Sequence, residues 1–143
     1  MPTLQSGQVV PNFSVTNAQG ATLQRNDFRA KAALLILFLP PADAQTDEYL
    51  AALSDTVGGW GRAHTALVIT QEAARDLDGL ALLHDQDGAA ASRFLPAGAP
   101  GGWFITDRYG ELYAHGEAQS TADLPRPSAF TEWLEFVGMR CGG

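Results

Sequence analysis

A run of eight apolar residues at positions 32–39 is the strongest pattern in the chain. No polar residue interrupts it, so the run predicts a strand that is covered on both faces, as at the centre of an α/β sheet. Shorter extended segments, rich in apolar and β-branched residues, are predicted at residues 9–15, 21–23, 65–70 and 80–83.

A helix is predicted directly after this run, once Pro40 and Pro41 have ended the strand. Residues 44–56 have a helix-compatible composition, and Asp43 stands where an N-cap is expected. The helix would bury a stripe with i, i+3, i+7 spacing, made of Leu50, Leu53 and Val57.

The remainder of the chain alternates helical and extended segments. We expect one or two helical turns at residues 71–76, a short helix at 89–94 and a final helix capped by Ser128. Residues 97–102 are rich in glycine and proline and predict a flexible loop. The two segments that flank the turn at 107–110 predict a β-hairpin, with strands at residues 103–106 and 111–114. The order favours an α/β protein with a mixed central β-sheet flanked by helices, and the 143 residues suit one domain, 1–143.

Charge and hydropathy exclude several classes of partner. The net charge is −7, and an acidic chain has no clustered positive charge for phosphate backbones, so no nucleic-acid partner is expected. No stretch of 18 apolar residues is present, so no membrane partner is expected. The first residues lack the basic region and apolar run of a secretory signal, and we therefore expect a cytoplasmic protein.

Cysteine is represented by a single residue, Cys141. One cysteine cannot form an intrachain disulfide, and a structural zinc site needs several closely spaced Cys or His ligands. We expect neither a metal nor another cofactor.

Four segments, taken in order, resemble the peroxiredoxin-like or redoxin (thiol-specific antioxidant) branch of the thioredoxin-fold superfamily. Residues 7–15 resemble its opening pattern G-x-x-x-P-x-F, and residues 27–31 resemble D-[FY]-[RK]-G-K. Residues 35–40 match the strand that leads to the active site, and residues 104–112 resemble F-[IL]-[IV]-D-x-x-G-x-[IL]. The resemblance implies a thioredoxin-like fold over residues 7–137.

The chain departs from this family where its reactive cysteine should stand. The family signature is P-x-x-x-[TS]-x-x-C, and counting from Pro40 or from Pro41 places Asp47 or Glu48 at the cysteine. The other family pattern, C-x-x-C, aligns with residues 43–46 and meets no cysteine either.

A second active-site group of the family is also missing. Its arginine would fall near Gly101 or Gly102. Peroxide reduction needs a thiolate that accepts oxygen as sulfenic acid, and a carboxylate has no equivalent oxidation. The resemblance therefore implies the fold without the usual peroxidase activity, and no catalytic residue is assigned.

The acidic residues Asp43, Asp47 and Glu48 have two interpretations. They match the positive end of the helix dipole, which is worth ~0.3–1 kcal/mol per charge. Alternatively, they form a polar pocket with Thr46 and His84 that binds a small ligand or a metal, although no ligand spacing supports a metal.

Two hypotheses for function follow. In the first, the protein is non-catalytic and binds a protein partner or a small ligand through the degenerate active-site loop, which comprises Pro40, Pro41, Asp43, Thr46, Asp47, Glu48, Gly101 and Gly102. In the second, it is an atypical antioxidant thiol oxidoreductase that uses Cys141 as its redox thiol. A homodimer is compatible with either.

Overall fold

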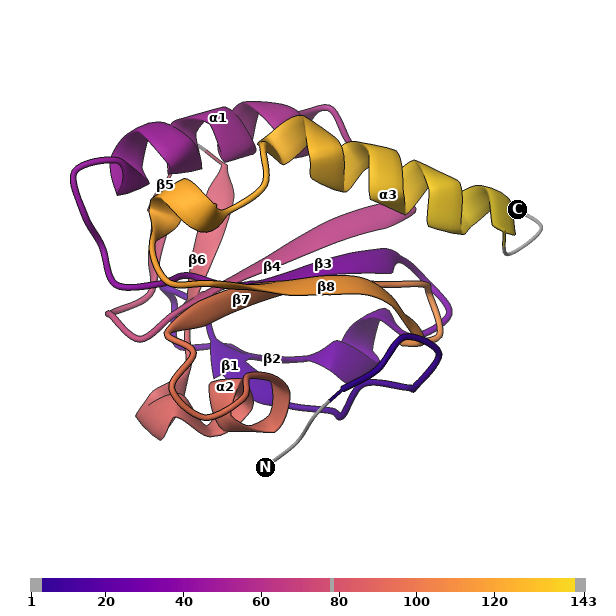
Figure 1. Ribbon diagram of the computed structural model, residues 1–143, viewed down its shortest axis with the longest axis horizontal. Coiled ribbons are helices and arrows are strands. Elements are labelled where there is room, and N and C mark those ends of the chain that lie inside the picture. The colour runs from indigo at the N-terminus through magenta and orange to yellow at the C-terminus, as the bar shows by residue number, and fades with distance from the viewer. Residues whose placement is uncertain (1–3, 78, 141–143) are drawn as a thin grey trace.

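The computed structural model describes residues 4–77 and 79–140, with the side chains of residues 139 and 140 left out. Within these residues, eight strands join one sheet in the order β2-β1-β6-β4-β3-β7-β8, with β5 paired to β6 (Figure 1). The strands are β1 (Ser14–Thr16), β2 (Thr22–Gln24), β3 (Ala33–Phe38), β4 (His64–Thr70), β5 (Arg75–Leu77), β6 (Leu80–His84), β7 (Gly101–Thr106) and β8 (Leu112–Ala118). The helices are α1 (Thr46–Gly58), α2 (Ala89–Phe94) and α3 (Pro127–Arg140), with 3-10 turns η1 (Arg25–Phe28), η2 (Gln86–Gly88) and η3 (Thr121–Asp123).

Strand β3 occupies the centre of the sheet, as its apolar run predicts. It pairs in parallel with β4 and antiparallel with β7, so the sheet is mixed. All six of its residues are buried. Leu35 and Leu37 point to one face of the sheet, whereas Leu34, Ile36 and Phe38 point to the other. A strand with apolar residues at every position needs cover on both sides, and both sides are covered here.

Helices α1 and α3 lie side by side on one face of the sheet (Figure 1). Leu50 and Leu53 of α1 are buried against the sheet, and Val57 is partly buried beside them, so the predicted stripe is confirmed. From α3, Phe130 and Leu134 complete this layer. The three- and four-residue spacings place these side chains on the inner face of each helix.

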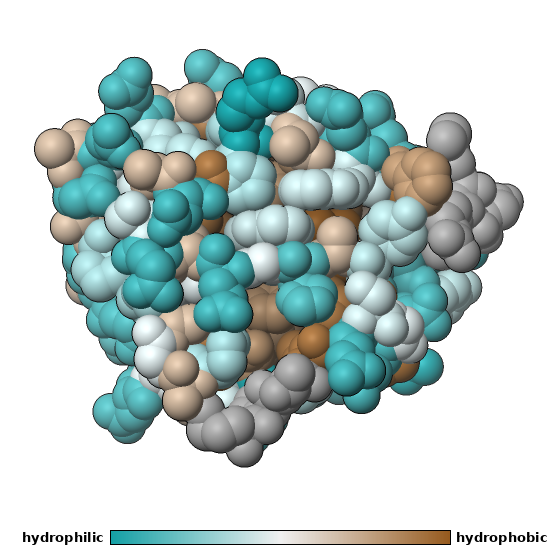
Figure 2. Space-filling model, viewed as in Figure 1, coloured by the Kyte–Doolittle hydropathy of each residue, from teal (hydrophilic) through white to brown (hydrophobic). Residues whose placement is uncertain are grey.

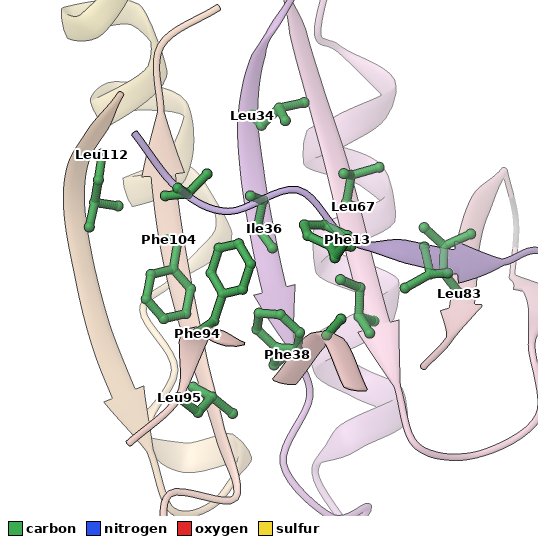
Figure 3. Close-up of a cluster of buried hydrophobic side chains, with 14 residues drawn as sticks. Phe13, Leu34, Ile36, Phe38, Leu67, Leu83, Phe94, Leu95, Phe104 and Leu112 are labelled. Carbon is green, nitrogen blue, oxygen red and sulfur yellow. The ribbon is translucent and has the colours of Figure 1, made fainter. Parts of the chain in front are cut away.

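The opposite face is covered by α2 and the β1–β2 hairpin, around a cluster of phenylalanines (Figure 3). Phe94 of α2 lies at its centre, with ring centroids 5.3 Å from Phe13, 5.3 Å from Phe38 and 5.1 Å from Phe104. Burial of each such side chain stabilises the fold by about 1.5–3 kcal/mol relative to exposure.

The layer that contains the phenylalanine cluster reaches the surface between α2 and β8. A hollow of about 80 Å³ is lined there by Leu4, Phe94, Pro96 and Phe104, among others. Figure 2 shows apolar surface among polar side chains on the face of the molecule that carries β8.

Asp85 holds the start of α2. Its carboxylate is 1% exposed and accepts hydrogen bonds from the backbone N–H of Ala90 and of Ala91 at 2.8 and 2.9 Å, and from the side-chain amide of Gln71 at 3.1 Å. Three donors compensate the burial of this acidic group. The short helix predicted at residues 89–94 is confirmed.

The prediction of helical turns at residues 71–76 is wrong. Residues 75–77 form β5, which pairs antiparallel with β6 across a turn where Gly79 has φ of 89°. The ladder with β6 supplies backbone hydrogen bonds that an isolated turn would lack, so pairing outweighs local preference.

Four boundaries also differ from the sequence-based predictions. The predicted strand at 9–15 forms regular pairing only from Ser14, with a single bridge between Val9 and Glu111. Helix α1 begins at Thr46 with Gln45 at the cap position, so Asp43 lies before the cap. Helix α3 begins at Pro127, so Ser128 is its second residue rather than its cap. The predicted loop at 97–102 is shorter, because its last two residues open β7.

Candidate functional site

The loop from the end of β3 to the start of α1 borders a cavity of about 130 Å³. The lining residues come from this loop, from the first turns of α1, and from β4, β5, β6 and the β4–β5 connection: Leu39, Pro40, Ala42, Asp43, Thr46, Asp47, Leu50, Thr70, Glu72, Ala73, Arg75 and Leu82. The sequence-based site residues Pro40, Asp43, Thr46 and Asp47 are therefore brought together.

Thr46 is the buried polar centre of this loop. Its hydroxyl oxygen accepts a hydrogen bond from the backbone N–H of Asp43 at 2.8 Å and lies 3.0 Å from the hydroxyl of Thr121. The carboxylate of Asp43 in turn accepts from the backbone N–H of Gln45 at 2.8 Å. These bonds satisfy the N–H groups of Asp43 and Gln45, which precede α1, and the contact with Thr121 ties the loop to η3, 75 residues further along the chain.

Charged groups surround the mouth of the cavity. Asp47 and Arg75 approach to 3.7 Å, but their side chains are 91% and 52% exposed. A pair so exposed stabilises the fold by at most about 1 kcal/mol, because water screens it. Asp43, Asp47 and Glu72 contribute three carboxylates against the single guanidinium of Arg75.

Glu48 and Tyr49 face a different groove, of about 340 Å³, on the other side of the α1 start. This groove is lined by Gln45, Glu48, Tyr49, Ala52, Thr121, Ala122, Leu124, Arg126 and Pro127. The Tyr49 hydroxyl donates to the carbonyl of Pro125 at 2.7 Å. Burial raises the pKa of Tyr49 above its ordinary value, because the phenolate form would lose hydration.

Gly101 and Gly102 are buried in β7 and do not line the cavity. A Cβ atom at Gly101 would lie 2.7 Å from the nitrogen of Pro40, and one at Gly102 would lie 2.7 Å from the carbonyl oxygen of Gly116. The prediction that these glycines belong to a flexible loop is wrong, because both lie in β7. They allow close backbone approach, and the contact of Gly101 with Pro40 leaves no space for a ligand between those two residues.

The remaining sequence-based candidates lie apart. Pro41 belongs to the loop and is exposed, but it does not line the cavity. The Nδ1 atom of His84 lies 2.8 Å from the carbonyl oxygen of Glu72, and His84 does not line the cavity either. Cys141 lies outside the residues that the structure describes. Within that described part, no three His, Cys, Asp or Glu side chains form a group that could hold a metal ion.

Sequence reasoning missed Thr70, Glu72, Arg75 and Thr121. Arg75 and Glu72 fall in the segment predicted as helical turns, so no signal associated them with α1. Thr121 carries no recognisable motif.

This arrangement offers hydrogen bonds and charge but no thiol. The chain has one cysteine, at position 141, so no sulfur lies in the β3–α1 loop or in α1. The cavity can bind a ligand through hydroxyl, carboxylate and guanidinium groups.

Within the described residues, no helix has both the length and the apolar composition needed to span a bilayer.

Comparisons with known proteins give the fold. No family model and no curated protein sequence matches the chain. Among solved structures, it is similar to Enterococcus faecalis AhpC, with a TM-score of 0.76 and 12% identity over 96% of this chain and 94% of that one. A peroxiredoxin-like protein from Aquifex aeolicus gives 0.73 and 11% identity, over 96% and 90% of the chains. The exposed lipoprotein thioredoxin Etrx1 from Streptococcus pneumoniae gives 0.71 and 13% identity, over 88% and 99%.

These similarities confirm the predicted fold class, a thioredoxin-like α/β fold with a mixed sheet flanked by helices. At these identities they carry no activity over to this chain.

Proposed function

We propose that this protein is a redox-inert member of the thioredoxin-like fold that binds a small amine-bearing ligand in the cavity at the start of α1. The observation that carries the proposal is the hydroxyl of Thr46, which is held by Asp43 and Thr121 at the point where this helix begins. The loop is thus organised by hydrogen bonds that have no redox chemistry.

The ligand class follows from the charges around the cavity. Three carboxylates and one guanidinium give the lining an excess of negative charge, which favours a cation with several N–H donors. Thr46 and Thr70 place further oxygen atoms in the wall.

The redox-inert part is tested by peroxide consumption with a thiol donor. We expect neither the wild type nor Cys141→Ser to turn over peroxide above the uncatalysed rate. Turnover in the wild type that disappears in Cys141→Ser would instead support the alternative, an antioxidant thiol oxidoreductase that uses Cys141.

The binding part is tested with a matched pair of probes, n-butylamine and n-butanol, followed by chemical shifts of backbone amides. The amine should give saturable shifts around Asp43 and Asp47, and the alcohol should not. Asp47→Asn should weaken the amine by up to about fivefold, since water screens the charge of this exposed carboxylate. Glu48→Gln is the control, because Glu48 is adjacent but faces the other groove. Equal effects of the two substitutions would contradict the proposal.

We also propose that the protein forms a homodimer through β8, because β8 is the last strand in the order of the sheet. Among the described residues, the backbone hydrogen bonds from the N-terminal segment to this strand are at its start, between Gly7, Gln8 and Leu112. If two copies of β8 paired antiparallel about Gly116, His115 of each copy would lie opposite Glu117 of the other, a favourable cross-strand pair. Sedimentation should show a dimer that Glu117→Lys weakens, and a monomer at all concentrations would contradict it.

We also propose a cytoplasmic location, because a chain with a single cysteine has no disulfide framework of the kind found in small secreted domains. Cell fractionation with an antibody to the protein tests this, and recovery in the envelope fraction would contradict it.

A further inference from the structure

Positively charged residues are concentrated at the end of the sheet opposite the candidate site. Of the nine lysine and arginine residues in the chain, five lie near the starts of β3 and β4 and the β7–β8 hairpin, although the net charge is −7. They are Arg25, Arg29, Lys31, Arg62 and Arg108. This concentration is unexpected in an acidic protein, because like charges repel one another.

Backbone contacts hold this region together. The turn before β3 and the β7–β8 hairpin lie side by side at the end of the sheet below the end of α3 (Figure 1). The N–H of Ala30 donates to the carbonyl of Arg108 at 2.7 Å, and Ala30 has φ of 65°, a strained conformation for a non-glycine residue. The N–H of Ala33 donates to the carbonyl of Ala63 at 2.7 Å, which places His64 beside the same turn.

A cavity of about 110 Å³ opens between these segments. It is lined by Lys31, Ala33, Ala63, His64, Asp107, Arg108, Val137 and Gly138. Lys31, His64 and Arg108 thus approach from three separate elements, while Ala33 and Val137 form an apolar wall. The cavity has the scale of a small ion rather than of a drug-sized molecule.

Arg108 has unused hydrogen-bonding capacity. Its Nε is shielded from solvent, yet it makes no hydrogen bond with any residue the structure describes. An unsatisfied buried donor of this kind is destabilising, and an acceptor that reached it would remove that cost. The guanidinium is held over the ring of Tyr109, 5.1 Å from its centroid.

Asp107 is the acidic residue in the lining, and its charge is partly compensated. One carboxylate oxygen accepts from the backbone N–H of Tyr109 at 2.8 Å and of Glu111 at 3.0 Å. These bonds form the hairpin turn. The positive groups in the lining therefore outnumber the acidic one.

The surrounding residues reinforce the positive potential. Arg25 is only 7% exposed, and a Cβ at Gly110 of the hairpin would meet its guanidinium. Burial, and then the charge of Arg29, lower the pKa of Arg25, as expected where cations crowd together. A bound anion would relieve this repulsion.

We infer that this cavity is an oxyanion site for phosphate, either as the free ion or as the phosphoryl group of a phosphate monoester. A tetrahedral phosphate presents oxygens to donors on several sides, whereas a planar carboxylate serves donors that lie in one plane. Arg108 supplies a planar fork and Lys31 a point charge, the two side chains that proteins most often use for phosphate.

The test is a titration of the full chain with inorganic phosphate in a phosphate-free buffer, at constant ionic strength, followed by amide chemical shifts. We expect saturable shifts at Lys31, His64 and Arg108. Phenyl phosphate is the second probe. Tighter binding of phenyl phosphate identifies the phosphoryl group of a larger molecule, and binding of inorganic phosphate alone identifies the free ion; both outcomes support the site.

Substitutions separate a specific site from general charge attraction. Lys31→Gln and Arg108→Gln should each weaken phosphate by about tenfold, since a charge-assisted hydrogen bond is lost. Arg62→Gln removes the same charge nearby without touching the cavity, and should change the dissociation constant by less than about twofold because salt screens it. Lys31 is exposed, so its variant keeps the test available if Arg108→Gln fails to fold. The inference is overturned if phosphate gives no saturable shifts, or if Arg62→Gln weakens binding as much as the two lining variants.

Discussion

Gly101 lies against Pro40 so closely that a side chain on the glycine would collide with the backbone. Its Cβ would stand 2.7 Å from the nitrogen of Pro40 and 2.7 Å from the carbonyl oxygen of Phe38. The contact closes the space between the end of β3 and the start of β7. The open cavity lies instead on the side of β4 and β5.

Gly101→Ala should therefore lower the free energy of unfolding by about 1–3 kcal/mol, the usual cost of overpacking. Gly58→Ala is the control. Gly58 ends α1 with nothing within 4 Å of its Cβ position, so that variant should be neutral or stabilised by up to about 1 kcal/mol. Urea unfolding measures both, and an unchanged stability in Gly101→Ala would mean that β7 can move away from Pro40.

The hydroxyl pair of Thr46 and Thr121 should show energetic coupling. Thr46→Val removes the bond to Thr121 and also the bond from the backbone N–H of Asp43, whereas Thr121→Val removes only the first. We expect losses of about 2 and about 1 kcal/mol respectively. A double-mutant cycle should give a coupling of about 1 kcal/mol, and strictly additive losses would show that the two hydroxyls do not interact.

Stability should fall at alkaline pH because of Tyr49. Burial raises its pKa in the folded state, while the unfolded phenol ionises near its ordinary value of about 10. Above that pH the folded state binds more protons than the unfolded state, so the free energy of unfolding decreases as pH rises. The stabilisation is fully present below pH ~10 and is lost above it.

Unfolding titrations at pH ~8 and pH ~10.5, on either side of the phenol's ordinary pKa, measure this effect. Tyr49→Phe should be less stable at the lower pH, because the bond to Pro125 is lost, and should show a smaller alkaline decrease. Tyr109→Phe serves as the control, because Tyr109 is exposed. The same alkaline decrease in Tyr49→Phe as in the wild type would assign it to another group.

Asp85 should have a larger effect on stability than an exposed acidic residue. Asp85→Ala leaves the N–H groups of Ala90 and Ala91 without their acceptor inside the fold, and we expect a loss of about 2–3 kcal/mol. Asp55→Ala, at an exposed position in α1, should change stability by less than about 0.5 kcal/mol. Equal stabilities of the two variants would show that α2 does not depend on this cap.

Much of the fold could be predicted from local patterns. The apolar run at 32–39 and the hairpin around 107–110 were both found in place, because burial on two faces and turn chemistry leave direct marks in the sequence. The turns expected at 71–76 were wrong, because β5 exists only through its ladder with β6. Which glycines are buried could not be predicted either, since Gly101 looks like any loop glycine until Pro40 is placed beside it.

The central strand and the absence of cysteine from the β3–α1 loop can be read directly from the sequence, because both are properties of consecutive residues. Which side chains share a cavity depends on how the chain folds. Arg75 meets Asp47, Thr121 meets Thr46, and Lys31 shares a cavity with Arg108, because the fold packs helices, turns and strands together that are distant in the chain. The physical reason is that local preferences act over a few residues, whereas these neighbours are set by which strands pair and which faces are buried.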